Sequence, residues 1–470
     1  MTTPLIDPAD FLARNSAGLA NSYLDCPICH HRHTIPIGAM QVGDNLVDAI
    51  PDHARRILRR DPRQACLIYD HAIEPIIQKD VIEPLRRTGL NFSLLPLSGQ
   101  AGHLLDSEIH LCDLTAAHLD PSVDFLIGAG SGVICDITKW VATRSARPFL
   151  LFGAAPSMNA YTSITATITE GDIKITHLLD PAGAVLLDVK MQAEAPMDMI
   201  QAGIGDLAAR AICNADWMLA HFLQGAYFCP LPFQMCAWYE KNYLAAAADI
   251  RQRKPAALAQ LSEAVLMSGL SMTVLNGETS PSSGAEHVIS HFWDLLTHVR
   301  GLPKNFHGAQ VGVGTLIMIA FYQYMRKLDI GRIDPQAILR NRPSLEAMQG
   351  ENDHLYGSSA SMFNEVVRSK RIPDRDVVPY IRSVQSRWDA LWSALDPYVP
   401  SLASIREPFL AAGVPHTLAE VRRSPAEGVE ALVKGPQYRS RYTMLDLAWE
   451  LGVLPGAAEE ILALAGVLEK

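Results

Sequence analysis

Three histidines and one aspartate stand at spacings that could bind a divalent metal ion. His287 and His291 are four residues apart, so in a helix both side chains lie on one face. His307 follows in a Phe-His-Gly turn before a helix-like stretch, and Asp206 ends the segment Gly-Ile-Gly-Asp. Two imidazoles and one carboxylate with an open fourth position form the ligand set of a catalytic divalent metal. Because the chain has 16 histidines, a chance grouping of surface or core histidines is the competing interpretation.

A glycine-rich stretch could hold a phosphate group. Gly128-Ala129-Gly130-Ser131-Gly132 directly follows an apolar run and precedes a helix-like stretch. Glycines let the backbone approach an anion, and the first amides of the helix point toward it. The spacing fits neither G-x-G-x-x-G nor the P-loop, so a tight turn is the alternative. Asp70 ends another apolar run, where it could bind the hydroxyls of a ribose or cap a helix.

Two closely spaced thiols form a third candidate site. Cys26 and Cys29 are followed by His33, and thiolates and imidazole at this C-x-x-C-x-x-x-H spacing could hold three corners of a tetrahedral zinc ion. A second C-x-x-C does not occur, so a fourth ligand would have to come from elsewhere or be water. Unligated surface thiols and a redox pair are the alternatives, although the segment precedes the first βα unit. The other cysteines are expected to be reduced and buried.

The elements that must position these residues change in character along the chain. Up to residue 195, short apolar runs alternate with helix-like stretches, which predicts a parallel sheet with helices on both faces. After residue 195, helical patterns rich in Ala, Leu and Met dominate. The predicted strands are 65–69, 92–97, 123–127, 149–152 and 184–187, with a hairpin at 164–179 attached to the same sheet. The predicted parts are an N-terminal extension with the C-x-x-C pair (1–34), an α/β domain (35–195) and an all-α domain (196–470).

Composition restricts the class of protein. The 470 residues include 40 Lys and Arg against 50 Asp and Glu, and the net charge of −10 argues against nonspecific binding to nucleic acid. A hydrophobic content of 49% is ample for sizeable cores. The sequence has no run of about 18 apolar residues, as a membrane helix needs, and its first 21 residues lack the layout of a signal peptide. We expect a soluble cytoplasmic protein without a nucleic-acid or membrane partner.

Six motifs resemble, in order, the signature blocks of sn-glycerol-1-phosphate dehydrogenases in the iron-containing alcohol dehydrogenase and dehydroquinate synthase superfamily. They read YDHA, GAGSGVICDITK, APSMNAYTS, AGIGDLAAR, SGAEHVISH and FHGAQVG, within residues 35–330. The resemblance implies a dehydroquinate synthase-like fold: an α/β dinucleotide-binding domain, then a helical metal-binding domain. It also implies a homodimer or higher homo-oligomer, and a metal-dependent, NAD(P)-linked oxidoreductase. The implied reaction interconverts dihydroxyacetone phosphate and sn-glycerol 1-phosphate, or a closely related phosphorylated polyol.

The resemblance also implies roles for individual residues. Asp206, His287 and His307 match the ligands of one divalent metal, which could be zinc, nickel or iron. Asp206, His291 and Asn159 match catalytic positions, and His291 matches a histidine that contacts the substrate. NAD or NADP is expected to bind at Asp70, Gly130, Ser131, Gly132, Val133, Ile134, Ser157 and Ser163. Asp70 favours NAD, since its carboxylate repels a 2′-phosphate.

Residues 153–160 depart from the family pattern. The family usually reads Pro-Thr-Ala-x-Ser-x-Asp-Gly, and this chain reads GAAPSMNA. Asn159 replaces the substrate-contacting aspartate; asparagine keeps the shape but carries no charge and cannot act as a base. Ala154 lacks the threonine hydroxyl that contacts the cofactor. These changes leave open a different anionic carbonyl substrate, a dehydroquinate-synthase-like lyase, or a catalytically silent nucleotide- and metal-binding module.

The acidity of the chain sets a further requirement, because a phosphorylated substrate needs local positive potential. The metal, helix N-termini and side chains such as Lys139, Arg210 or Lys304 are the candidate sources. Residues 400–470 carry no motif that indicates a function; they could extend the helical domain or form an oligomer contact.

Overall fold

The computed structural model describes residues 8–99, 105–171 and 173–468. The chain forms two compact units. Unit 1 contains the chain up to Leu207 together with Cys229–Thr279, and unit 2 contains Ala208–Phe228 together with Ser280–Lys470. The predicted boundary near residue 195 marks the change from strands to helices, since the last strand ends at Asp188. The two compact units are a different division, because the chain leaves unit 1, returns to it and leaves it again.

Unit 1 is built around a six-stranded sheet in the order β3-β10-β7-β6-β4-β5, in which all neighbours run parallel. The four inner strands are almost entirely buried and read as continuous apolar runs, as expected when helices cover both faces. The strands of this sheet are β3 (Ala39–Gly43), β4 (Ala65–Asp70), β5 (Phe92–Leu97), β6 (Phe125–Gly130), β7 (Phe149–Gly153) and β10 (Ala184–Asp188).

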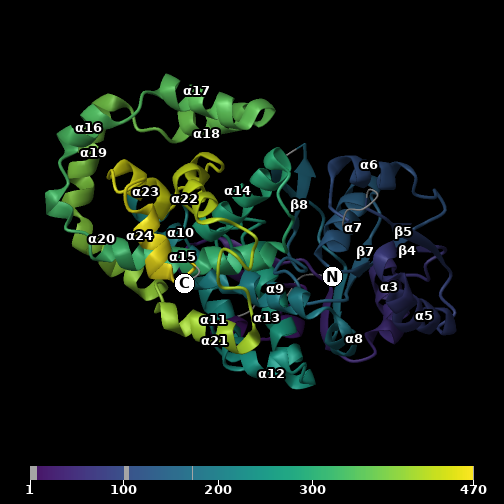
Figure 1. Cartoon of the computed structure of the whole chain (residues 1–470). Coiled ribbons are helices and arrows are strands. Elements are labelled where there is room, and N and C mark those ends of the chain that lie inside the picture. The colour runs from purple at the N-terminus through teal and green to yellow at the C-terminus, as the bar shows by residue number, and fades with distance from the viewer. Residues whose placement is uncertain (1–7, 100–104, 172, 469–470) are drawn as a thin grey trace. The chain divides into compact units, whose positions relative to one another are not determined.

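Alternate residues of the strands pack against different helices. Leu67 and Ile127 belong to one apolar core with Ile50 of α3 and Leu85 of α5. On the other face, a Cβ added to Gly128 would collide with Thr138 of α7, so this helix lies close to β6. Figure 1 shows α7 beside β7, the strand that pairs with β6. The helices of unit 1 are α1 (Pro8–Ala13), α2 (Ser16–Leu19), α3 (Ile50–Leu58), α4 (Glu74–Ile77), the π-helical turn η3 (Gln78–Ile82), α5 (Glu83–Arg87), α6 (Ile109–Ala117), α7 (Gly132–Ser145), α8 (Val189–Glu194), α9 (Met197–Ala208), α11 (Leu231–Ala245), α12 (Ala247–Arg251) and α13 (Pro255–Thr273).

The strand predictions agree with this sheet at five of its six positions. The run that begins at Val123 forms a strand only from Phe125, and β3 was not predicted, because its five residues are mostly half-buried and show no apolar run. The predicted hairpin forms as β8 (Thr165–Glu170) and β9 (Ile173–Leu178), but its attachment to the main sheet is wrong. It is a separate sheet that packs against α7, where the buried Lys139 donates to the carbonyl of Thr165 at the start of β8.

A second hairpin lies in the N-terminal extension of unit 1. Strands β1 (Ser22–Asp25) and β2 (Arg32–Ile35) pair antiparallel, with Ser22 opposite Ile35. The connecting turn contains Cys26 and Cys29, so this segment has a defined fold rather than being an appendage.

Every element of unit 2 in the described residues is a helix. α14 and α15 are buried along most of their length and carry the three histidines of the sequence motifs. The region 400–470 extends this unit, since α24 packs against α15 and Arg423 donates to the carbonyl of Trp293. The α-helices are α10 (Arg210–Gln224), α14 (Ala285–Arg300), α15 (His307–Arg326), α16 (Pro335–Asn341), α17 (Leu345–Tyr356), α18 (Ala360–Lys370), α19 (Asp374–Ser386), α20 (Trp388–Leu395), α21 (Leu402–Ala412), α22 (Pro425–Lys434), α23 (Met444–Glu450) and α24 (Ala458–Ala465). Among the described residues, no helix combines the length and apolar character needed to cross a membrane.

Candidate dinucleotide and metal site

The order of the strands places two predicted cofactor residues side by side in unit 1. β5 lies on one side of β4 and β6 on the other, so the direction of winding reverses between β4 and β6. In open parallel sheets, ligands bind at such a reversal, beyond the carboxyl ends of the strands. The register pairs Tyr69 with Ala129, which brings the next residues, Asp70 and Gly130, to that edge together.

The glycine-rich loop packs closely on its neighbours. A Cβ on Gly130 would stand 2.8 Å from Ile134 Cγ1, and one on Gly132 would stand 2.8 Å from Met158 Sδ. α7 begins at Gly132, and the side chain of Ser131 does not cap it, so its first amides are available to an anion. This cradle fits the pyrophosphate of a dinucleotide.

Asp70 caps a turn at the carboxyl end of β4. Its Oδ1 accepts a hydrogen bond from the amide of Ala72 at 2.9 Å, so it caps the short 3₁₀ turn His71–Ile73. The side chain is half-buried at the carboxyl end of β4. One carboxylate oxygen is therefore used by the fold.

The two predicted cofactor serines have different surroundings. Ser157 is half-buried in the loop after β7. Ser163 is buried, its hydroxyl lies 2.7 Å from Thr165 Oγ1, and it accepts from the amide of Thr165 at 3.1 Å. The Ser163 hydroxyl therefore stabilises the start of β8, and Ser157 is the better placed of the two to reach a ligand.

Asp206 and Asn159 are brought together within unit 1. Asp206 lies on α9 and is 1% exposed, and its Oδ2 accepts from the backbone amide of Asn159 at 2.8 Å. Gly203, one turn earlier, makes this approach possible, because a Cβ there would collide with the carbonyl oxygen of Pro156. The AGIGDLAAR and APSMNAYTS motifs thus form one structural feature, although about 40 residues separate them.

The three histidines form a cluster within unit 2. His287 and His291 lie one turn apart on α14, and His307 is the first residue of α15. The His287 and His307 ring centroids are 5.2 Å apart, those of His291 and His307 are 5.0 Å apart, and His291 is 6.1 Å from His287. Asp206 belongs to unit 1, whereas the histidines belong to unit 2.

Hydrogen bonds at Nδ1 orient two of these rings, and the Glu286 carboxylate, which can only accept, places the proton of His287 on Nδ1. His287 Nδ1 lies 2.9 Å from Glu286 Oε1, and His307 Nδ1 lies 3.1 Å from Ser290 Oγ. A ring that donates from Nδ1 presents the lone pair of Nε2, and metal-binding histidines are commonly held this way. The donor chemistry and orientation of these two imidazoles therefore fit a divalent ion.

Buried carboxylates lie beneath the first turn of α14. Glu286 is fully buried, and Asp216 of α10 accepts from the amide of Ala285 at 2.7 Å and from the Tyr322 hydroxyl at 2.7 Å. Burial, together with the charge of Glu286, raises the pKa of Asp216 to about 7. Negative charge concentrated in a buried environment favours a cation at the adjacent His287.

His291 differs electrostatically from an exposed histidine. Burial lowers its pKa well below the ordinary value of 6.5, and the charges of Arg439 and His307 lower it further, while the Asp294 carboxylate, 3.7 Å from His291 Nδ1, opposes the shift. The ring is therefore neutral at pH 7. Donor atoms of His291, Asp294 and His307 also lie within 4.8 Å of one another, so this side of the cluster could hold an ion too.

The sequence motifs did not identify all of these residues. Glu286 and Ser290 lie inside SGAEHVISH, where a carboxylate beside a histidine was the available signal. Arg439 lies in a region without motifs, so no pattern indicated it. Of the predicted cations, Lys139 is committed to the carbonyls of Ala160 and Thr165.

Comparison with known proteins identifies the family of the chain. Residues 44–196 match the family model of the iron-containing alcohol dehydrogenases. The glycerol-1-phosphate dehydrogenase [NAD(P)+] of Geobacillus stearothermophilus is 30% identical over 297 residues, which cover 63% of this chain and 72% of that protein. The enzyme of the same name from Halalkalibacterium halodurans is 26% identical over 336 residues, covering 71% and 79%.

Solved structures show the same fold. A probable glycerol dehydrogenase from Sinorhizobium meliloti aligns with a TM-score of 0.57 at 15% identity, covering 92% of this chain and 98% of that one. Glycerol dehydrogenase from Schizosaccharomyces pombe aligns with a TM-score of 0.54 at 16% identity, covering 92% of each chain. The predicted fold class, an α/β dinucleotide-binding part followed by a helical part, is confirmed. The chain belongs to the glycerol-1-phosphate dehydrogenase family of the iron-containing alcohol dehydrogenases.

Proposed function

We propose that the chain interconverts dihydroxyacetone phosphate and sn-glycerol 1-phosphate, or a closely related phosphorylated polyol, as a metal-dependent, NAD(P)-linked oxidoreductase. Membership of the family confirms the predicted enzyme class, an NAD(P)-dependent dehydrogenase. The observation that carries the proposal is the orientation of His287 and His307, whose Nδ1 atoms contact Glu286 and Ser290. Imidazoles held at Nδ1 by a neighbouring group are common among metal-binding histidines.

Asp206, His287 and His307 hold one divalent ion in this proposal. When bound, such an ion polarises the substrate oxygen and lowers the pKa of the alcohol. The amide of Asn159 fixes the Asp206 carboxylate, and Glu286 and Ser290 fix the two rings. The ligand set accepts zinc, nickel or iron, so metal analysis of the purified protein has to identify the ion.

Unit 1 holds the nicotinamide dinucleotide. The amides from Gly130 to Ile134 bind its pyrophosphate, and Asp70 accepts hydrogen bonds from the adenine ribose. Ser157 and Ser163 complete the set implied by the family, with Ser163 acting through the position of β8. The negative charge of Asp70 disfavours NADP, so we expect a preference for NAD.

The remaining groups act on the substrate. His291 is neutral at pH 7, so it can accept the proton of the alcohol during oxidation, and in reduction the imidazolium that forms by taking up a proton from solvent returns it to the substrate oxygen. The half-buried Arg439 guanidinium, which affects the pKa of His291, supplies positive charge for the phosphate. Asn159 offers a hydrogen-bond donor where the family has a carboxylate.

A substrate screen with NADH and NADPH, combined with metal analysis of the same sample, tests the proposal. Oxidation of NADH in step with formation of a phosphorylated alcohol is the expected result. Product formed without net NADH consumption would indicate the lyase, and neither change would indicate a silent binding module. His287→Ala should lose both metal and activity, and a fully active His287→Ala enzyme would contradict the metal assignment.

Asn159→Asp addresses the identity of the substrate. If the chain evolved toward a different anionic carbonyl compound, restoring the family carboxylate should raise turnover of dihydroxyacetone phosphate. Unchanged or lower turnover would count against a different substrate. The predicted cytoplasmic location and homo-oligomeric state stay predictions, and light scattering on the purified chain measures the latter.

A further inference from the structure

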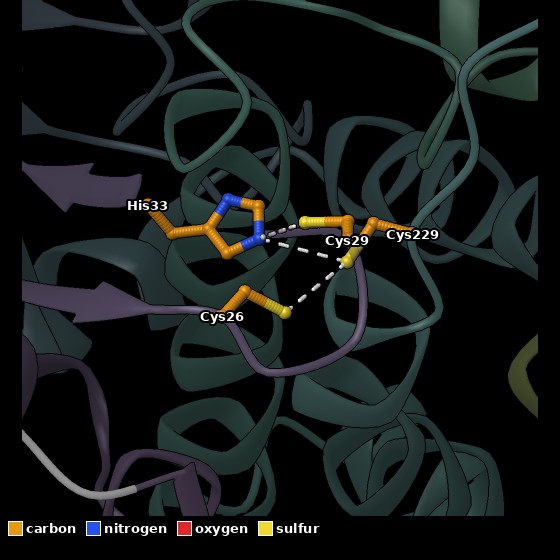
Figure 2. Close-up of side chains that lie close together, drawn as sticks. All are labelled: Cys26, Cys29, His33 and Cys229. Carbon is orange, nitrogen blue, oxygen red and sulfur yellow. Dashed lines mark hydrogen bonds between the residues drawn. The ribbon is translucent and has the colours of Figure 1, made fainter. Parts of the chain in front are cut away.

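Unit 1 contains a second group of potential metal ligands, far from the motifs of the dehydrogenase family in sequence. The turn between β1 and β2 brings Cys26, Cys29 and His33 together with Cys229, which precedes α11 (Figure 2). Three of the four side chains are almost completely buried, and Cys29 is half-buried. One donor atom from each lies within 4.8 Å of every other. The fourth ligand missing from the C-x-x-C-x-x-x-H pattern is thus present, about 200 residues further along the chain.

Three of the six distances between the donor atoms can be compared with those of a tetrahedral zinc site. Cys26 Sγ lies 3.9 Å from Cys229 Sγ, and His33 Nε2 lies 3.3 Å from Cys29 Sγ and 3.5 Å from Cys229 Sγ. Zinc binds sulfur at about 2.3 Å and nitrogen at about 2.0–2.1 Å, which separates neighbouring sulfurs by about 3.8 Å and sulfur from nitrogen by about 3.6 Å. Each observed distance agrees with these values to about 0.3 Å.

The surrounding structure orients the ligands. His33 Nδ1 lies 2.9 Å from the carbonyl oxygen of Val274, which can only accept, so Nδ1 carries the proton and Nε2 faces the thiols. Two backbone hydrogen bonds close the turn, from the His30 amide to the Cys26 carbonyl and from the Cys26 amide to the His31 carbonyl, both at 3.0 Å. His30 adopts a left-handed conformation with φ of 60°, which reverses the chain between the cysteines and the histidine.

We propose that Cys26, Cys29, His33 and Cys229 bind one structural zinc ion. Three thiolates and one imidazole provide four protein ligands and leave no open position, which distinguishes this site from a catalytic one. The site ties the N-terminal hairpin to the segment where the chain re-enters unit 1. It does not depend on the dehydrogenase activity, and its ligands are separate from Asp206, His287 and His307.

A disulfide is the main competing explanation for these thiols. All eight cysteines lie in the described part of the chain, and each is a thiol. A Cys26–Cys229 disulfide would require the sulfurs to approach from 3.9 Å to about 2.05 Å. It would also not explain why Cys29 Sγ lies 3.3 Å from His33 Nε2. The surface-thiol interpretation is wrong for Cys26, which is 3% exposed.

Metal analysis of the full-length chain tests the proposal. The chain is produced with zinc supplied, and its metals are counted by inductively coupled plasma mass spectrometry in a His287→Ala background that removes the catalytic ion. We expect one zinc per chain, and its loss when Cys229→Ser or Cys29→Ser is added. Cys236→Ser, in α11 and outside the cluster, is the matched control and should keep the zinc.

Measurements on the unmodified chain keep the test decisive if a cysteine variant does not fold. X-ray absorption at the zinc edge should show three sulfur ligands at about 2.3 Å for each structural zinc ion. A mercurial reagent that titrates thiolates should release this zinc. Zinc bound only by nitrogen and oxygen, or its full retention in both cysteine variants, would overturn the proposal. So would iron in place of zinc, or six titratable thiols in the denatured, unreduced chain instead of eight.

Discussion

Glu286→Gln is expected to weaken metal binding without damaging the fold. Glu286 is completely buried, and its Oε1 accepts from the amide of Gly284 at 2.5 Å and contacts His287 Nδ1 at 2.9 Å. Glutamine has nearly the same shape and its carbonyl oxygen can accept both hydrogen bonds, but it lacks the negative charge. The substitution therefore tests whether the carboxylate tunes the imidazole or merely fills space.

The expected loss follows from the role of this carboxylate. Removing a hydrogen-bonded partner of a metal-binding histidine usually weakens metal binding by about 10- to 100-fold, or roughly 1.4 to 2.7 kcal/mol. The metal-free variant should be at least as stable as the unmodified chain. The reason is that Glu286 and Asp216 repel each other in the interior, and this repulsion helps raise the pKa of Asp216 to about 7.

Two measurements separate the effect on metal affinity from the effect on stability. Competition with a chromophoric chelator gives the affinity for zinc, and thermal unfolding of the metal-free protein gives Tm. Glu450→Gln is the matched control, since this carboxyl also lies in unit 2, accepts from the Tyr442 hydroxyl at 2.6 Å and should not affect metal binding. Metal affinity within twofold of the unmodified chain would refute the reasoning, and a large fall in Tm would mean that Glu286 is structural.

Four further predictions concern the substrate, the cofactor and stability. His291→Gln should lower kcat by about 10²- to 10⁴-fold with metal content unchanged, measured by steady-state kinetics and metal analysis. Arg439→Ala should raise KM for the phosphorylated substrate by about 10- to 100-fold, with partial recovery in Arg439→Lys, and an equal effect on an unphosphorylated analogue would exclude a phosphate contact. Asp70→Ser should raise kcat/KM with NADPH relative to NADH, and an unchanged ratio would remove Asp70 from the ribose site. Burial raises the pKa of Glu450 from 4.5 to about 7, so between these pH values the folded protein retains a proton that the unfolded chain releases. The free energy of unfolding should therefore fall by about 3 kcal/mol as pH rises from 4.5 to about 7. Denaturant titrations at several pH values should show a smaller fall in Glu450→Gln.

The buried strands and the glycine loop could be predicted from the sequence because each is a local pattern. A fully covered parallel strand such as Ala65–Asp70 must be apolar throughout, and the close packing of Gly130 on Ile134 tolerates no side chain. The edge strand Ala39–Gly43 lacked such a signal, because it is only partly buried and therefore mixes polar and apolar residues.

The parts of the site that depend on contacts between distant residues could not be predicted. Cys229 completes a ligand set that begins at Cys26, and nothing in its own neighbourhood distinguishes it from other buried cysteines. Asp216 anchors the start of α14 from another helix, so its sequence context indicated only a helix. Even the hairpin at 164–179 was predicted correctly as a local structure and incorrectly in its pairing.

The pairing of β3 with β10 has a consequence for how the polypeptide folds during its synthesis. β3 is the first strand of the main sheet to leave the ribosome, yet its partner is the last, since Ala39 pairs with Ala184. β4, β5, β6 and β7 are all synthesised after β3 and before β10, and the contacts among these four strands close shorter loops. We therefore expect the sheet to grow outward from β4, with the earliest-made strand docking last, so that chains arrested before residue 184 should expose the β3 segment to proteases.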